Sequence, residues 1–289
     1  MEPVWERPPG REVAADRGVD AAPTVRLLLD EARISMPLRE ARLLLRHVLG
    51  VSHATLEAHP EGKVSLQDTA SFRALAARRT VGEPVAYLTG HREFYGLEFH
   101  VTPAVLIPRE ETELLVEIAV EKPARRILDL GTGSGCLAIA VASELPQAQV
   151  TAVDASAAAL AVARENAARH GVAVRFLRGD WFAPLEGERF DLILANPPYV
   201  AENDPHLAQG DVRFEPRSAL AAGPDGLDDI RRIVAAAAAH LLAGGRLFFE
   251  HGYDQAQAVA ALLAQAGFVA IEQRRDLAGI PRVTGGARP

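Results

Sequence analysis

The spacing of apolar residues changes character along the chain. From residue 24 to about residue 82, apolar residues recur every three or four positions, which is the period of amphipathic helices. After residue 125, short apolar runs typical of buried strands alternate with helical stretches. The pattern therefore predicts a small N-terminal helical bundle followed by an α/β domain with a doubly wound, mostly parallel sheet.

Three helices are expected in the bundle. The first follows Thr24, a suitable cap, and the second opens at Pro37 and ends at Gly50. The third covers residues 65–79. The apolar residues expected on their inner faces include Leu27, Leu28, Ala32, Ala41, Leu44, Leu45, Phe72, Leu75 and Ala76.

Changes of composition suggest four segments. Residues 1–22 are rich in proline, glycine and charge, and we expect a flexible tail. Residues 23–82 form the helical domain, and residues 83–108, with aromatic residues set between glycines, form a hairpin linker. The α/β domain then occupies residues 109–289.

In the α/β domain, the helix expected at 225–242 is stopped by Gly244 and Gly245. The other expected helices cover 137–145, 157–170 and 255–266, and the expected strands cover 126–130, 149–153, 174–177, 190–195, 246–250 and 269–274. Ligands of such sheets bind at the carboxyl ends of the strands, where several polar residues of this chain fall.

Composition limits the classes of protein that fit. The 289 residues carry a net charge of −7, which weighs against a dedicated nucleic-acid-binding protein. The single cysteine, Cys136, excludes an intrachain disulfide and fits a cytoplasmic protein. The N-terminus resembles no signal peptide, and no apolar run approaches the length of a membrane span. Nothing in the pattern demands an oligomer, so we expect a monomer without membrane association.

A glycine-rich loop follows the first strand of the α/β domain. After Asp129 and Leu130 come Gly131, Thr132, Gly133, Ser134 and Gly135. A dinucleotide-binding loop would place its third glycine one residue later. This spacing resembles the first motif of class I S-adenosylmethionine-dependent methyltransferases. A plainer alternative is a turn that only packs a helix on the sheet.

Acidic residues end the next two strands. Asp154 could accept the ribose hydroxyls of an adenosine, or could simply cap the following helix. Asp180 could bond the adenine amine while Trp181 covers the ring; the alternative is a capping aspartate beside core aromatics. Asp154 supports an adenosine ligand without choosing the cofactor.

The fourth strand ends in Asn196, Pro197, Pro198 and Tyr199. An amide or exocyclic amine nitrogen is a poor nucleophile, and it must be held with its lone pair aimed at the methyl carbon. The Asn196 side-chain oxygen and the Pro197 carbonyl could each accept one N–H of an NH₂ group. The prolines lend rigidity, and Tyr199 can pack on the flat group. The alternative is a strand stop made of two prolines.

Other polar residues suggest no second site. Asp204 and His206 lie close together but lack the further ligands of a metal site, so no metal is expected. His251 is a lone histidine with a structural role, and Cys136 is a small core residue.

Taken together, the segments DLGTGSG, AVD, GDWF and NPPYV resemble the protein-(glutamine-N5) methyltransferases of peptide-chain release factors. The resemblance extends to GEPVAYLTGHREFYG (82–96), TPAVLIPRxETE (102–113), DPHLAQGDVRFEP (204–216) and LFFEHG (247–252), and covers residues 24–285. One departure is Glu110, where the family pattern has proline.

The resemblance implies a seven-stranded, Rossmann-like class I methyltransferase fold whose helical domain docks the release factor. It implies S-adenosylmethionine as the donor and the glutamine of a Gly-Gly-Gln loop as the acceptor. The implied cofactor contacts are residues 131–135, Asp154, Trp181 and Asn196. The glutamine would be held by residues 196–199.

Two alternatives stay open. An adenine-N6 methyltransferase of nucleic acid shares the glycine loop and the Asn-Pro-Pro-Tyr motif. A binding protein built on a degenerate methyltransferase fold is the other, although intact Asp129, Asp154 and Asn196 argue against it.

Overall fold

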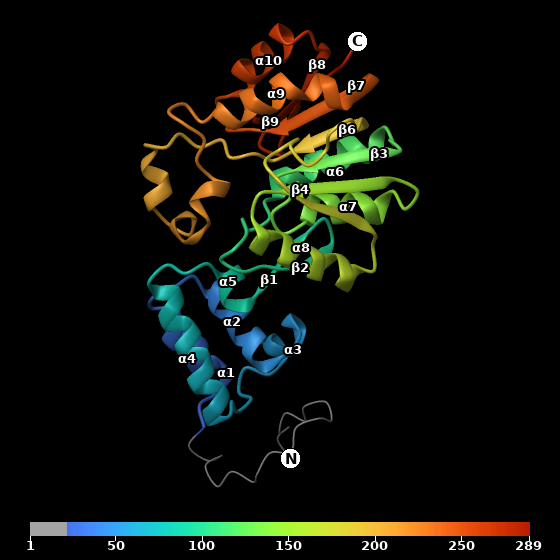
Figure 1. Cartoon of the computed structure of the whole chain (residues 1–289). Helices are drawn as coiled ribbons and strands as arrows, with labels where there is room; N and C mark the ends of the chain where they lie inside the picture. The colour runs from blue at the N-terminus through green and yellow to red at the C-terminus, as the bar shows by residue number, and fades with distance from the viewer. Residues whose placement is uncertain (1–21) are drawn as a thin grey trace. The chain divides into compact units, whose positions relative to one another are not determined.

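The computed structural model describes residues 22–289, and the tail expected for 1–22 lies, except for its last residue, outside the described residues. The chain divides into two compact units, one ending at Thr89 and one beginning at Gly90 (Figure 1). Each unit has its own hydrophobic core and is described by itself.

The N-terminal unit is the expected helical bundle. Thr24, Ser52 and Ser65 cap helices by accepting a backbone N–H three residues later. Phe72 lies at the centre of its apolar core. Leu27 does not lie on the inner face as expected: it is 49% exposed, and Val25 is buried instead. The helices are α1 (Val25–Ala32), α2 (Leu38–Leu49), α3 (His53–Ala58), α4 (Leu66–Thr80) and α5 (Val85–Thr89).

The aromatic segment contains a short β-hairpin that packs in the core of the C-terminal unit. Strands β1 (His91–Phe94) and β2 (Leu97–His100) pair antiparallel. Phe94 and Phe99 are fully buried in the cluster that covers one face of the large sheet. Residues 85–89, expected to be extended, are helical because Pro84 can open a helix but cannot continue a strand ladder.

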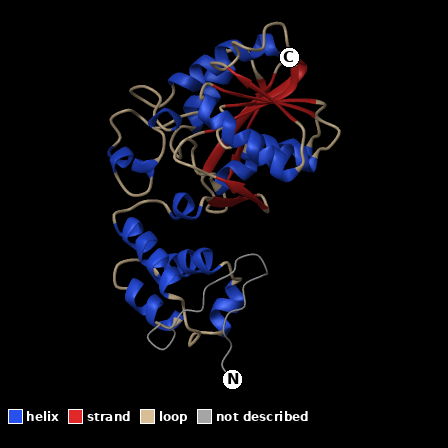
Figure 2. Cartoon of the chain, turned by 60° about the horizontal axis from the view of Figure 1, so that its bottom comes forward, coloured by secondary structure: helices blue, strands red, loops and turns tan. Residues whose placement is uncertain are grey.

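A seven-stranded sheet with order β5-β4-β3-β6-β7-β9-β8 forms the C-terminal unit, parallel except for the pairings of β9, and confirms the predicted fold. Figure 2 shows helices on both of its faces. The strands are β3 (Arg126–Leu130), β4 (Gln149–Asp154), β5 (Val174–Arg178), β6 (Phe190–Ala195), β7 (Leu241–Glu250), β8 (Val269–Arg275) and β9 (Pro281–Ala287).

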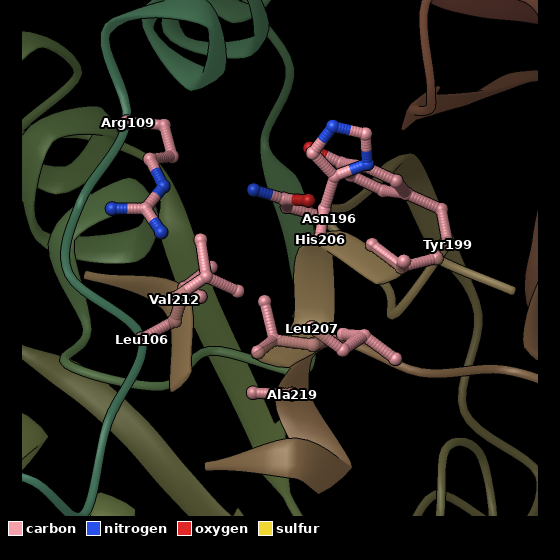
Figure 3. Close-up of a pocket in the computed structure, with 10 residues that line it drawn as sticks. Leu106, Arg109, Asn196, Tyr199, His206, Leu207, Val212 and Ala219 are labelled. Carbon is pink, nitrogen blue, oxygen red and sulfur yellow. The ribbon is translucent and has the colours of Figure 1, made fainter. Parts of the chain in front are cut away.

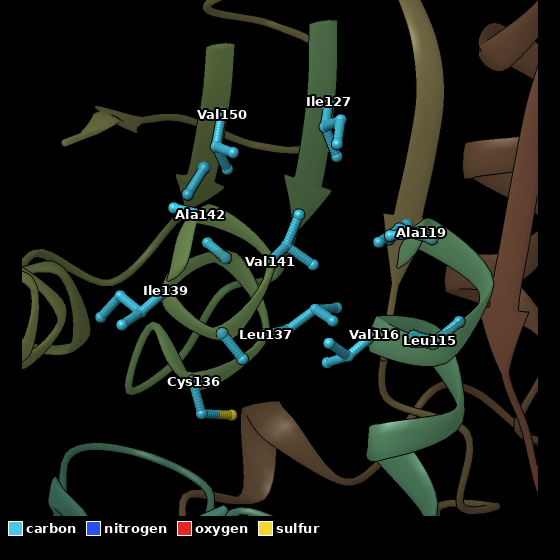
Figure 4. Packing of buried hydrophobic residues seen from close by; sticks show 14 of the residues in the cluster. Leu115, Val116, Ala119, Ile127, Cys136, Leu137, Ile139, Val141, Ala142 and Val150 are labelled. Atoms are coloured by element: carbon cyan, nitrogen blue, oxygen red, sulfur yellow. The ribbon is translucent and has the colours of Figure 1, made fainter. Parts of the chain in front are cut away.

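Five helices cover the two faces. Helices α6, α7 and α8 pack with the hairpin on one face, and α9 and α10 cover the other. Figure 4 shows Val116 of α6 beside Leu137 of α7 in the first of these layers. Their bounds are α6 (Glu113–Glu121), α7 (Cys136–Glu144), α8 (Ala157–His170), α9 (Asp228–His240) and α10 (Ala256–Gln265).

Three features of this unit differ from the sequence expectation. Helix α6 and strand β9 were not expected. Helix α9 ends at His240, and β7 begins at the next residue, so Gly244 and Gly245 lie within a strand and do not stop the helix. A Cβ added to Gly245 would lie 3.1 Å from the Phe190 carbonyl oxygen, so close approach of the neighbouring strand requires glycine there.

Candidate active site

The carboxyl ends of four neighbouring parallel strands meet at one edge of the sheet. Strand β3 ends at the glycine loop and β4 ends at Asp154. Strand β6 leads into Asn196, and β7 ends at Glu250. Since β4-β3-β6-β7 are consecutive in the sheet, these groups are brought to a common edge.

The glycine loop has a backbone conformation that favours glycine, and it is tightly packed at only one end. Gly131, Gly133 and Gly135 have φ values of 76°, 56° and 83°. Residues other than glycine rarely adopt positive φ values of this kind. A Cβ on Gly135 would lie 3.0 Å from the Ala163 Cβ, whereas one on Gly133 would meet nothing within 4 Å. The loop therefore packs against α8 at one end and opens onto free space at its centre.

Thr132 and Ser134 alternate with the glycines of this loop. Both side chains are buried, and the Thr132 hydroxyl donates to the Asp129 carboxylate at 2.6 Å. Burial raises the pKa of Asp129 to about 7, against the hydrogen bond from Thr132. Any contact of Thr132 or Ser134 with a ligand would therefore use backbone atoms.

Asp154 lies beside the loop and does not cap the next helix. Its two oxygens accept the backbone N–H groups of Gly133 and Ser156, at 2.9 and 2.8 Å. The cap of α8 is Ser156, whose hydroxyl accepts the Ala159 N–H. The alternative that Asp154 is a helix cap is therefore wrong. Its half-buried carboxylate keeps lone pairs for a ligand.

The Trp181 ring lies close to the glycine loop, at the point where the loop approaches the end of β6. A Cβ added to Gly131 would lie 3.3 Å from the Trp181 ring and 3.9 Å from the backbone oxygen of Asn196. The indole N–H donates to Asp229 at 3.2 Å, which fixes the ring edge. Three motifs that are far apart in the sequence therefore converge on one space.

Asp180 and Phe182 flank that tryptophan differently. The exposed Asp180 carboxylate forms an ion pair with Arg232, which would have to be shared or broken for contact with an adenine amine. Phe182 is buried and stacks on His240 with ring centroids 4.5 Å apart. Phe182 is therefore a core aromatic, as one of the two sequence interpretations supposed.

The Asn-Pro-Pro-Tyr backbone is held from both sides. The Tyr199 N–H donates to the Leu220 carbonyl at 3.1 Å, and the Tyr199 carbonyl accepts from the Gln255 side chain at 2.9 Å. Pro197 and Pro198 are buried. The backbone of the motif is therefore fixed in place by its neighbours.

Asn196 uses its side-chain nitrogen within the protein. The Nδ2 atom donates to the Thr112 hydroxyl at 2.9 Å. A carboxamide has two N–H donors and one oxygen acceptor, so one N–H is used here and the Oδ1 atom remains as the acceptor for a ligand. An NH₂ group would find an acceptor here, as the sequence interpretation requires.

Glu250 lies behind this arrangement and was assigned no role from the sequence. It is 1% exposed and accepts the hydroxyls of Thr112 and Tyr199, the latter at 3.1 Å. Burial raises the pKa of Glu250 to about 7, and burial and Glu250 together raise the pKa of Tyr199. The sequence did contain a signal for Glu250: an acidic residue directly follows the apolar residues of β7, at the edge of the sheet where ligands bind.

A cavity of about 180 Å³ opens beside Asn196 and Tyr199 (Figure 3). Arg109 lines it and pairs with Glu215, whose side chain is fully buried and also accepts the Ile107 N–H at 2.9 Å. The remaining lining residues are Leu106, Val200, His206, Leu207, Val212, Ala219 and Leu220. The walls are mostly apolar, with the Asn196 amide and the Arg109 guanidinium as the main polar groups.

Residues outside the cavity behave as packing groups. His251 is buried, burial lowers its pKa, and its ring bonds the Gly252 carbonyl and Thr284 hydroxyl at 2.9 and 2.7 Å. Cys136 is in the core, and burial raises its pKa to about 12. Across residues 22–289 no group of three acidic, histidine or cysteine residues is arranged to hold a metal. In that same part of the chain, no helix is both long and apolar enough to cross a bilayer.

The chain is similar to known methyltransferases over most of its length. Residues 109–213 match the methyltransferase small domain, and residues 24–90 match the PrmC N-terminal domain. The release factor glutamine methyltransferase of Bordetella pertussis is 56% identical over 256 residues, covering 87% of this chain and 95% of that protein. The protein of the same name from Vibrio cholerae is 48% identical, covering 89% and 91%.

Solved structures share the fold of the C-terminal unit. The T. thermophilus 16S rRNA N2 G1207 methyltransferase, in complex with AdoMet and guanosine, aligns with a TM-score of 0.52 at 23% identity, covering 69% of this chain and 50% of that one. A methyltransferase from Pyrococcus furiosus aligns with a TM-score of 0.52 at 17% identity, covering 67% and 89%. The sheet order and the family match together define a class I methyltransferase. Within that class, the chain belongs to the release factor glutamine methyltransferase family.

Proposed function

We propose that the protein transfers the methyl group of S-adenosylmethionine to the side-chain nitrogen, N5, of the glutamine in the Gly-Gly-Gln loop of peptide-chain release factors. The observation that carries the proposal is the side chain of Asn196, which lines the cavity and donates from its nitrogen to Thr112, so that its oxygen is the acceptor available to a substrate NH₂ group. The name shared by its relatives supports the same substrate.

The open centre of the glycine loop fits the donor. Backbone atoms of residues 131–135 would approach it closely, and the Asp154 carboxylate would accept its ribose hydroxyls. Trp181 would cover the adenine, with Asp180 at its edge and Asn196 near the methyl group. When bound, the donor supplies an electrophilic methyl carbon on a sulfonium sulfur.

The glutamine amide would be held by two acceptors. The Asn196 Oδ1 atom and the Pro197 carbonyl would each accept one N–H, which aims the nitrogen lone pair out of the amide plane. Pro198 keeps the backbone rigid, and the Tyr199 ring packs on the flat amide. In-line attack by this nitrogen would form the new C–N bond as the bond between the methyl carbon and the sulfonium sulfur breaks. The donor would leave as the neutral thioether, and the nitrogen would lose one proton.

We further infer that residues 23–82 dock the release factor and that residues 83–108 link this docking domain to the catalytic domain. We also infer that the enzyme acts in the cytoplasm as a monomer and does not bind nucleic acid directly. Release factors act in translation, and the acidic net charge of −7 disfavours a nucleic-acid substrate.

Mass spectrometry of release factor incubated with the enzyme and isotope-labelled donor tests the assignment. We expect one methyl group on the Gly-Gly-Gln glutamine. Label on another residue would refute the proposed acceptor. Label in DNA or RNA, with none in release factor, would favour the adenine-N6 alternative.

A further inference from the structure

Three side chains from distant parts of the sequence form one hydrogen-bond chain behind the cavity. Thr112 ends the 3₁₀ helix η2 (Glu110–Thr112) and directly precedes α6, Asn196 follows β6, and Glu250 ends β7. The Asn196 Nδ2 atom donates to the Thr112 oxygen at 2.9 Å, and the Thr112 hydroxyl donates to Glu250. Thr112 and Glu250 are 3% and 1% exposed, so water does not compete along this chain.

The direction of each hydrogen bond follows from the group at the buried end. An ionised carboxylate can only accept, so the Thr112 hydroxyl must give its proton to Glu250. The Thr112 oxygen is then left to accept, and the Asn196 side chain must turn its nitrogen toward it. The Asn196 oxygen is thereby directed to the cavity, where an NH₂ group requires an acceptor.

We propose that Glu250 is a positioning residue which, acting through Thr112, holds the Asn196 amide with its oxygen toward the acceptor substrate. The inference rests on the proposed role of Asn196 but applies to any NH₂ acceptor. Glu250 also accepts from Tyr199 at 3.1 Å, so one buried carboxylate orients both polar side chains of the Asn-Pro-Pro-Tyr motif.

Replacing Glu250 by glutamine keeps the size of the side chain but allows the hydrogen bonds of the chain to reverse direction. A glutamine side chain can donate from its nitrogen to the Thr112 oxygen, which frees the Thr112 proton to bond the Asn196 oxygen. The Asn196 nitrogen would then face the cavity. Because this nitrogen can only donate hydrogen bonds, it could not accept the N–H groups of the substrate. The buried amide at position 250 keeps its own hydrogen bonds, so the fold is expected to survive.

Protonation of Glu250 would have the same effect as the amide. Its pKa is raised to about 7, mainly by burial and also by Glu111, and is opposed by the hydroxyls of Thr112 and Tyr199 and by Arg109. Cys136 also faces Glu250 and stays a neutral thiol, because burial raises its pKa to about 12. Activity that depends on the ionised form should therefore fall as pH drops through about 7.

The test compares Glu250→Gln, Thr112→Val and Thr112→Ser by steady-state methyl transfer. We expect Glu250→Gln and Thr112→Val each to lower kcat about 10- to 100-fold, with the KM for S-adenosylmethionine changed less than about threefold. Thr112→Ser keeps the hydroxyl and should stay within about threefold of the wild type. Thermal unfolding and calorimetry of donor binding establish that each variant is folded.

Two further measurements separate positioning from a general structural role. Because Glu250 acts through Thr112, the effects of the two substitutions should not multiply. The kcat of the double variant Glu250→Gln/Thr112→Val should be no more than about threefold below that of the less active single variant. The acidic limb of the wild-type kcat/KM profile, near pH 7, should be lost in Glu250→Gln. Asp129 is present in both proteins, so its own titration cancels in this comparison.

A wild-type kcat in Glu250→Gln would overturn the inference, as would losses that multiply in the double variant. If Glu250→Gln does not fold, the Thr112→Val and Thr112→Ser pair decides: equal activity of the two overturns it. Failure of the proposed function is separate, because it is seen in the wild type as label on a different acceptor. The variants are then compared on that acceptor.

Discussion

Asn196 occupies a position where one substitution removes chemistry with little loss of packing. Its side chain is half-buried, with the nitrogen bonded to Thr112 and the oxygen beside the cavity. Truncation removes the acceptor for the substrate and leaves the Thr112–Glu250 bond in place. The residue is therefore more important for transfer than for stability.

We expect Asn196→Ala to lower methyl transfer by at least about 100-fold, because the acceptor nitrogen is no longer aimed. Labelled-donor incorporation measures the loss, and thermal unfolding should change little. Asn203→Ala is the matched control, since Asn203 is exposed on the following loop and should keep full activity. Undiminished transfer by Asn196→Ala would remove Asn196 from its proposed role.

The centre of the glycine loop offers a second test at this scale. Gly133→Ala places a methyl group in the open space where the donor is proposed to bind, at a φ of 56°. We expect donor affinity to fall at least about tenfold and stability to fall by about 1 kcal/mol. Calorimetry and urea denaturation measure the two effects.

Gly171→Ala is the control for backbone strain. Gly171 ends α8 with a φ of 66°, and a Cβ there also meets nothing within 4 Å. It should lose similar stability and keep donor affinity. Equal donor affinity in Gly133→Ala and the wild type would contradict the proposed position of the donor.

At the scale of elements, the segment after Tyr199 is anchored to the stretch before α6 by one buried carboxylate. Glu215 pairs with Arg109 and accepts the Ile107 N–H. The three 3₁₀ helices η3 (Pro205–Ala208), η4 (Val212–Phe214) and η5 (Arg217–Ala219) lie in that segment and contribute walls to the cavity.

Arg109→Met should lower the free energy of unfolding by about 3 kcal/mol, because it leaves the buried Glu215 carboxylate without its cation. Chemical denaturation measures the change, and Arg109→Met/Glu215→Gln should recover most of it. The matched substitution Arg169→Met breaks an exposed pair with Glu165 on α8 and should cost less than about 1 kcal/mol. Equal losses in the two single variants would contradict the buried anchor.

Elements with a strong apolar period were predictable from the sequence, and those set by partners were not. Strand β9 contains Gly285 and Gly286 and has no apolar run, and glycine is required where Gly285 lies against Phe248. Strand β7 extends back to Leu241 because it pairs with Phe190 of β6. Neither feature is encoded in the local pattern.

At the scale of the whole molecule, two buried carboxylates link stability to pH. Burial raises the pKa values of Asp129 and Glu250 to about 7, above their unfolded values. The folded state therefore retains protons that the unfolded state releases. The stability these groups contribute at low pH is lost as pH rises through about 7.

Asp129→Asn/Glu250→Gln removes both titrations. The unfolding free energy of the wild type, relative to this variant, should therefore fall between about pH 5 and about pH 8. Urea denaturation of both proteins at the two pH values checks the difference and cancels the exposed groups that they share. A constant difference would show that neither carboxylate titrates as expected.

The sequence alone determined the helical bundle, the alternation of most strands and helices in the mostly parallel sheet, and the place of the glycine loop and the Asn-Pro-Pro-Tyr motif, because periodicity and turn residues act locally. Only the tertiary structure brought Thr112, Asn196 and Glu250 into one hydrogen-bond chain. These residues lie far apart in the sequence. The sheet order makes the strand ends at Asn196 and Glu250 neighbours, and Thr112 reaches them from the start of α6. Because the Glu250 carboxylate is buried, it accepts its hydrogen bonds from Thr112 and Tyr199 and sets the direction of the chain. This role depends on the surroundings of Glu250 and cannot be deduced from the residue type alone.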